Sequence, residues 1–107
     1  MTLRESGRVL FLMAVLALPA AALAAGKAHT ITIEGMKFAP ERLEVAAGDT
    51  ITWTNKDLVP HTASAGKALE SGTIPPNGKW KTVVRKKGEI DYTCRFHPGM
   101  HGVVVVK

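Results

Sequence analysis

The sequence predicts an all-β fold, an antiparallel β-sandwich, on three observations. No segment after the first 25 residues carries apolar side chains at helical spacing. Short runs instead alternate apolar and polar residues, which is the period of a half-buried strand. Turn-forming Gly, Pro, Asn and Asp separate these runs at nearly regular intervals. Many short strands punctuated in this way are typical of a sandwich.

The expected strands share one signature, alternation or a β-branched run between turn residues. Between them, residues 36–40 are expected to form a bend, Gly48-Asp49 a turn, and Asn77-Gly78 a tight hairpin. Residues 62–72 are small and polar and give no clear signal. In chain order the expected strands cover residues 30–34, 42–45, 50–55, 80–84, 89–94 and 103–106.

The N-terminus has the features of a secretory signal peptide. Two arginines precede an apolar run over residues 9–18, and Ala22-Leu23-Ala24 is an A-x-A-like cleavage signal. The apolar run is shorter than the roughly 20 residues of a spanning helix. We therefore expect a signal peptide over residues 1–24 and an exported domain over residues 25–107, located in the periplasm. The domain is then not stably inserted in the membrane after cleavage; an uncleaved anchor is the alternative.

The charge balance excludes some partners. The formal net charge of +5 falls to +4 without the leader, because the leader carries two arginines and one glutamate. A mildly basic domain favours an acidic patch on a protein partner, and it is too weakly charged to indicate nucleic acid. The densest basic stretch, Lys79, Lys81 and residues 85–87, is expected to be a solvated strand face and turn.

Cys94 is the only cysteine of the chain, so it cannot form an internal disulfide. A domain of this size has a modest core, and small exported domains commonly rely on disulfides. A lone cysteine in an exported protein therefore needs another explanation, which is an intermolecular bridge, a reactive thiol or a metal ligand.

Three metal-binding side chains follow one another near the C-terminus. Cys94, His97 and Met100 are separated by two-residue spacers, in a stretch expected to be a loop between two strands. A thiolate, an imidazole and a thioether are the soft and borderline ligands that suit copper. A trigonal blue-copper site needs a second imidazole, and His61, after Val59-Pro60, is the candidate.

On these residues the chain resembles the cupredoxins, the small blue copper proteins, and within them the amicyanin, plastocyanin and pseudoazurin group. Its short Cys-x-x-His-x-x-Met spacing is similar to the amicyanin loop. The resemblance implies a Greek-key sandwich of seven or eight strands with the metal at one end. It extends over most of the chain after the leader, in residues 36–40, 45–55, 59–61 and 92–106.

The same resemblance implies a cofactor and a ligand set. One copper ion, cycling between Cu(I) and Cu(II), is expected to be held by His61, Cys94 and His97 with Met100 as the axial ligand. Thr62 stands where these proteins commonly have an asparagine that ties the ligand loops together. How the sulfur of Cys94 is hydrogen-bonded is therefore an open question.

The leading functional hypothesis is a one-electron carrier between redox partners, and not an enzyme. The expected site holds copper in a geometry between those that Cu(I) and Cu(II) prefer. Little then has to move when an electron is gained or lost, so electron transfer is fast. Resemblance to amicyanin implies a dehydrogenase as electron donor and a c-type cytochrome as acceptor. We expect a monomer that binds no nucleic acid.

Other functions fit the sequence less well. A periplasmic copper-binding or delivery protein is the alternative, but the chain lacks the Met-rich or His-rich tracts common in that class. A Cys–His nucleophile lacks a motif for the third, orienting group. Zinc disfavours a methionine ligand. The absence of C-x-x-C excludes a c-type haem and a thioredoxin-like site.

Overall fold

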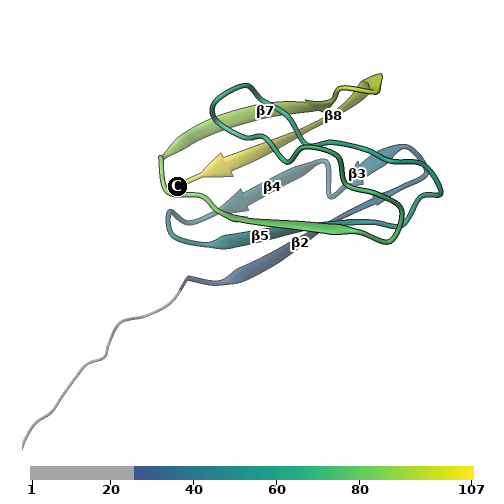
Figure 1. The fold of residues 1–107 in the computed structure, drawn as a ribbon. Helices are drawn as coiled ribbons and strands as arrows, with labels where there is room; N and C mark the ends of the chain where they lie inside the picture. The colour runs from purple at the N-terminus through teal and green to yellow at the C-terminus, as the bar shows by residue number, and fades with distance from the viewer. Residues whose placement is uncertain (1–25) are drawn as a thin grey trace, which may run out of the picture.

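The computed structural model describes residues 26–107, so the expected signal peptide over residues 1–24 lies outside it. Within that part of the chain the strands form two facing sheets, which confirms the predicted all-β sandwich (Figure 1). No helix long and apolar enough to cross a bilayer is found in residues 26–107. The strands are β2 (Ala28–Glu34), β3 (Lys37–Ala39), β4 (Arg42–Val45), β5 (Thr50–Asn55), β6 (Lys79–Val83), β7 (Gly88–Cys94) and β8 (His97–Val106).

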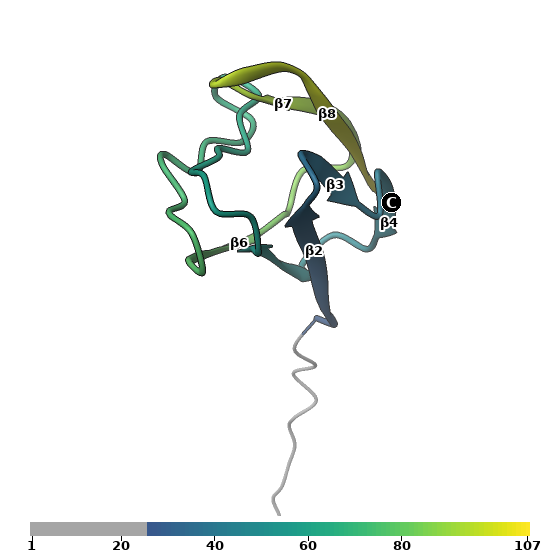
Figure 2. The same cartoon turned by 90° about the vertical axis from the view of Figure 1, so that its right-hand side faces the viewer.

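The pairing of the strands is mixed rather than wholly antiparallel. One sheet has the order β3-β2-β5-β6 and the other β4-β8-β7. The pairs β2–β5 and β4–β8 are parallel, whereas β2–β3, β5–β6 and β7–β8 are antiparallel. The chain passes between the sheets after β3, β4 and β6, as expected for a Greek-key sandwich. β7 and β8 run together on one side of the molecule, and β2 and β6 lie on the other (Figure 2).

An aromatic pair joins the two sheets in the core. Trp53 of β5 and Tyr92 of β7 are each at most 1% exposed, and their rings meet edge to face at 5.6 Å. The indole N–H of Trp53 donates to the Tyr92 hydroxyl over 3.3 Å, so the polar group of each ring has a partner. Burial raises the pKa of Tyr92 to about 12, which keeps the phenol protonated. Aliphatic residues from both sheets complete this core, among them Ile31, Ile33, Ile51 and Val104.

The expected bend over residues 36–40 is wrong, because this segment contains a strand. β3 pairs with β2 through a tight turn in which Gly35 and Met36 have φ of 64° and 62°. The carboxylate of Asp57 accepts hydrogen bonds from both turn N–H groups, over 2.7 and 3.0 Å, which holds this conformation. Phe38 is buried, at 3% exposed, whereas Met36 is 41% exposed and does not pack in the core.

The turn predicted at Asn77-Gly78 is confirmed, but the hairpin is wrong. Gly78 N–H donates to Pro75 carbonyl over 2.8 Å, and Asn77 has a φ of 66°. This turn leads into β6, whose antiparallel partner is β5, so residues 56–78 separate the two paired strands. That long connection carries part of the site described below.

A buried carboxylate fastens the end of the sandwich where β2 begins. Asp49 is 4% exposed and accepts the N–H groups of Lys27 and Ala46, each over 2.9 Å. Its third contact is with the Nε2 of His29, also at 2.9 Å. These bonds, that from Ala46 above all, lower the pKa of Asp49 from 3.8 to about 2. The ionised form of Asp49 therefore stabilises the fold.

Replacing this carboxylate should change how stability depends on pH. A group whose pKa is lower in the folded chain stabilises it above the unfolded pKa, and loses that contribution as pH falls through the folded value. We expect the unfolding free energy of the metal-free wild type to fall more steeply than that of Asp49→Asn from about pH 4 to about pH 2. Urea denaturation followed by tryptophan fluorescence measures both. Parallel curves would contradict this role of Asp49.

Candidate metal centre

Cys94 and His97 lie where β7 turns back into β8. Cys94 is the last residue of β7 and pairs with His97, the first residue of β8, across a register irregularity at Thr93 and Cys94. The expected ligand loop is therefore wrong in extent. Only Arg95 and Phe96 separate the strands, and both His97 and Met100 belong to β8. The strand backbone restrains these side chains more than a free loop would.

His61 reaches the same place from the connection that follows β5. Its backbone exchanges hydrogen bonds with Ile74, over 3.1 and 2.8 Å, and its side chain is fully buried. The buried amide of Asn55 holds the loop that precedes it. Its Nδ2 donates to the carbonyls of Val59 and Ile74, and its Oδ1 accepts the N–H of Asp57.

Three potential ligand atoms converge here. The Sγ of Cys94 lies 3.7 Å from Nδ1 of His61 and 3.5 Å from Nδ1 of His97. All three atoms lie within 4.8 Å of one another. The two imidazole rings are 4.8 Å apart and tilted by 56°. The structure therefore brings together Cys94 at the end of β7, His97 at the start of β8, and His61 from the connection after β5.

This spacing matches a trigonal metal site. Nitrogen and thiolate donors lie about 2.0–2.3 Å from a first-row metal ion, so two donors of a trigonal plane are about 3.5–4.0 Å apart. The two sulfur–nitrogen distances, 3.7 and 3.5 Å, fall in that range. One thiolate with two imidazoles is the planar donor set of blue-copper centres. The residues present therefore fit one copper ion.

Asp57 fixes the proton of His61. The Nε2 of His61 lies 2.8 Å from Oδ2 of Asp57, and a carboxylate can only accept, so Nε2 carries the proton. Its Nδ1 lone pair then faces the thiol of Cys94. Burial raises the pKa of Asp57, but hydrogen bonds from Met36, His61 and Gly35 outweigh that effect and hold the pKa below 3.8.

Thr62 answers the open question about the Cys94 sulfur. Its N–H donates to the Sγ of Cys94 over 3.4 Å, so the sulfur keeps a backbone donor. Its side-chain Oγ1 accepts the N–H of Arg95 over 2.9 Å. A threonine hydroxyl thus ties the segment after His61 to the segment after Cys94, the role expected of asparagine.

Burial differs among the four candidate ligands. His61, Cys94 and Met100 are 0%, 1% and 5% exposed, whereas His97 is only half-buried. Met100 lies three residues after His97, on the same strand. The segments that carry the two histidines and the Gly35–Met36 turn expose apolar side chains at this end. These are Met36, Leu58, Val59, Pro60, Phe96 and Pro98, which we call the apolar rim.

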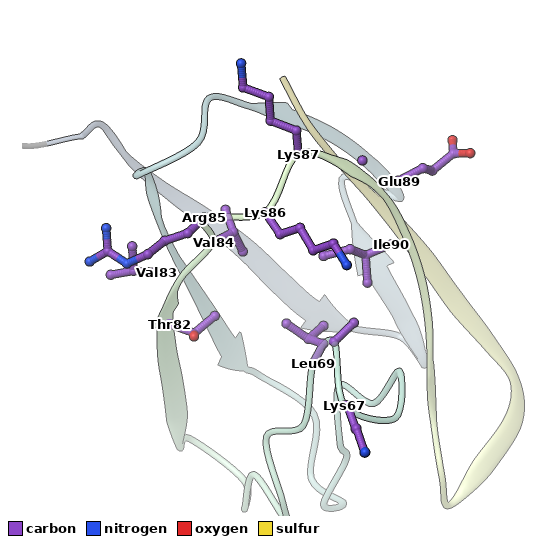
Figure 3. Close-up of a pocket in the computed structure, with 12 residues that line it drawn as sticks. Lys67, Leu69, Thr82, Val83, Val84, Arg85, Lys86, Lys87, Glu89 and Ile90 are labelled. Atoms are coloured by element: carbon purple, nitrogen blue, oxygen red, sulfur yellow. The ribbon is translucent and has the colours of Figure 1, made fainter.

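A hollow lies near the start of β7, at the opposite end of that strand from Cys94, and none of the four candidate ligands lines it. It measures about 390 Å³, and Leu69, Val84 and Ile90 point into it (Figure 3). The basic residues 85–87 are among those that line it, and they are exposed, as expected of a solvated turn. Residues 85–87 are therefore separate from the metal centre.

A family model for the cupredoxin-like domain matches residues 8–106 of this chain. The chain belongs to the cupredoxin family. Amicyanin of Paracoccus denitrificans is 35% identical over 94 residues, which cover 82% of this chain and 72% of that protein. Amicyanin-alpha of Methylorubrum extorquens is 31% identical over 83 residues, 72% and 70% of the two chains.

Solved structures agree with this assignment. The Cu(I) form of an amicyanin variant superposes with a TM-score of 0.70 at 32% identity, covering 82% of this chain and 90% of that one. A purple cupredoxin from Nitrosopumilus maritimus superposes with a TM-score of 0.68 at 28% identity, covering 73% and 98%. The resemblance seen in the sequence, to the cupredoxins and within them to the group that includes amicyanin, is confirmed.

The loop that delivers His61 should depend on Asn55. Asn55→Ala removes three hydrogen bonds and leaves two carbonyls without that donor, so we expect the unfolding free energy to fall by about 3 kcal/mol. Thr54→Ala, on the same strand but half-exposed, is the control and should change stability by less than about 1 kcal/mol. Chemical denaturation of the metal-free proteins measures both changes. Equal losses would mean that the Asn55 amide does not hold the loop.

Proposed function

We propose that this protein is an exported type 1 copper protein that carries one electron between redox partners. The observation that carries the proposal is the convergence of one sulfur and two imidazole nitrogens at trigonal spacing. His61, Cys94 and His97 would form the plane. Copper, when bound, supplies the one-electron Cu(I)/Cu(II) couple.

The side chains around the ligands keep the site from rearranging. Asp57 holds the tautomer of His61, and the N–H of Thr62 donates to the sulfur of Cys94. Both ligand segments are held by backbone hydrogen bonds between Ser64 and Thr93. A frame that is already arranged needs little movement when charge changes, which favours fast electron transfer.

Met100 is the proposed axial ligand. Its side chain is buried, and it lies on β8, three residues after His97. A weakly bound thioether on the axis of a trigonal site tunes the reduction potential. This assignment rests on burial and spacing, and on the donor chemistry of methionine.

Electrons would leave through His97. It is the least buried of the four candidate ligands and lies next to Phe96, which is 50% exposed. The apolar rim around it offers a surface on which a partner can exclude water. A dehydrogenase as donor and a c-type cytochrome as acceptor fit this role, with the chain acting as a monomer.

Export completes the proposal. Residues 1–24 would be the signal peptide and residues 25–107 the periplasmic domain, since the leader has a charged start, an apolar run and a small-residue cleavage site. Copper delivery is disfavoured because three of the four candidate ligands are almost fully buried, which slows release. An enzymatic thiol is disfavoured because the sulfur of Cys94 is closed to substrates.

The colour of the copper-loaded protein tests the ligand set. We expect the Cu(II) protein to be intensely blue, because of charge transfer from the Cys94 thiolate, and to have a small copper hyperfine splitting, because the covalent bond spreads the unpaired electron onto the sulfur. Cys94→Ser should abolish the colour, and Thr93→Ser, an exposed neighbour, should retain it. Visible absorption and EPR after copper loading provide the measurement. A colourless wild type would overturn the proposal.

Electron self-exchange between copies of the protein tests the exit through the rim. Phe96→Asp should slow it about tenfold, because charge on the docking face opposes a dry contact. Val83→Asp is a matched control, since Val83 is also an exposed apolar residue, at 41%, but lies on β6. Both substitutions add one negative charge, so the two variants have the same net charge. Self-exchange has no driving force, so a changed potential cannot explain the result. Equal rates in both variants, measured by NMR line broadening, would move the docking face away from His97.

A further inference from the structure

A closed ring of hydrogen bonds lies behind the turn that follows Cys94. The N–H of Arg95 donates to Thr62 Oγ1 over 2.9 Å, and this hydroxyl lies 2.9 Å from the hydroxyl of Ser64. Ser64 Oγ lies 3.1 Å from Oε2 of Glu70. The guanidinium of Arg95 donates to Oε1 of Glu70, which closes the ring on the residue where it began.

The chemistry of the members gives the ring one direction. A backbone N–H only donates and a carboxylate only accepts, whereas each hydroxyl has one proton to give. The proton of Ser64 therefore goes to Glu70, and the proton of Thr62 must make the bond between the two hydroxyls. This leaves a lone pair of Thr62 for the N–H of Arg95. Every bond then runs toward the carboxylate, an arrangement in which neighbouring hydrogen bonds strengthen one another.

Glu70 lies at the surface but is held by several hydrogen bonds. It accepts the N–H of Gly72 over 3.0 Å in addition to Ser64 and Arg95. The Gly72 bond contributes most to lowering its pKa below 4.5, and Ser64 and Arg95 add to this against the effect of burial. Thr62 and Ser64 are 2% and 8% exposed, so with Glu70 in place their hydroxyls depend on protein partners rather than on water.

The ring joins the segment that follows His61 to the segment that follows Cys94. Thr62 follows His61 directly, and Arg95 follows Cys94 directly. The backbones of Ser64 and Thr93 exchange hydrogen bonds of 2.9 Å beside it. A change in the orientation of either hydroxyl would therefore act on the contact between these segments, and on the 3.4 Å bond from Thr62 to the sulfur.

We propose that Glu70 is a positioning residue of the copper centre, which orients the hydroxyls of Ser64 and Thr62 and so fixes the Cys94 segment against the His61 segment. The inference rests on the proposed function only in naming the metal. The acceptor that sets the ligand spacing is thus at the surface, paired with an arginine that is 60% exposed.

The first experiment uses the metal-free protein, so it does not depend on copper. Glu70→Gln keeps the shape, but its amide can donate as well as accept and has no charge to attract Arg95. The exposed pair Arg42–Glu89, at 3.2 Å, provides the matched control Glu89→Gln. Exchange of the Arg95 amide proton is followed by NMR, with the core amide of Trp53 as internal reference.

We expect exchange of the Arg95 amide relative to Trp53 to be about tenfold faster in Glu70→Gln and unchanged in Glu89→Gln, because local opening exchanges the first amide and global unfolding the second. If Arg95 and Trp53 accelerate together, the variant has only lost overall stability, and the proposal is wrong. Unchanged exchange at Arg95 would equally overturn it.

The second experiment examines the copper-loaded protein. Glu70→Gln and Thr62→Val should both alter the copper hyperfine splitting and the reduction potential, whereas Thr62→Ser, which keeps the hydroxyl, and Glu89→Gln should resemble the wild type. If Thr62→Val and Thr62→Ser behave alike, the ring does not position the ligands. A wild type that fails to turn blue would reject the copper proposal, while the exchange result would still report on the ring.

Discussion

The site depends on one junction, where the segment from His61 to Ser64 meets the end of β7. His61 and Cys94 are 33 residues apart in the chain, yet the N–H of Thr62 reaches the sulfur of Cys94 and Ser64 pairs with Thr93. Neither segment could arrange the ligands alone, because a hydrogen bond in the interior is strong only when both partners are already in place. The sandwich brings the two segments together, and the hydrogen bonds of the junction fix the distances between the Cys94 sulfur and the two imidazole nitrogens.

Asp57 shows how few groups connect this junction to the remaining structure. One carboxylate accepts two N–H groups of the β2–β3 turn and the ring proton of His61. The turn that exposes Met36 and the histidine that faces the sulfur are therefore held by the same side chain. Asn55 acts similarly from β5, with both ends of its amide engaged. Such satisfied buried groups specify one arrangement where apolar packing alone would allow several.

Local patterns in the sequence predict part of the fold and part of the metal centre. Alternation predicted most strands, and the two-residue spacers after Cys94 predicted His97 as its neighbour. No local signal joins His61 to Cys94, 33 residues later, so His61 is predicted only from the second imidazole that a blue-copper donor set needs and from the family resemblance. The pairing of β5 with β6, and the roles of Asp57, Thr62 and Glu70, depend on how residues 56–78 fold back. That segment has no periodic pattern, so its contacts could not be predicted. Met36 at positive φ was missed for a similar reason, because a distant carboxylate overrides its backbone preference.

Both ends of the described domain lie away from His97. Lys27 and Lys107 join the turn between β4 and β5, through bonds to Thr50 and Ala47, and Val106 pairs with Gly88 at the start of β7 (Figure 1). Cys94 and His97 occupy the opposite end of the same strand pair. A tether at either end, to an electrode, a bead or another protein domain, would therefore hold the molecule at the end opposite the metal centre. The half-buried His97 would then face solution. The fold thus separates the points of attachment from the point of electron exchange, which suits oriented immobilisation.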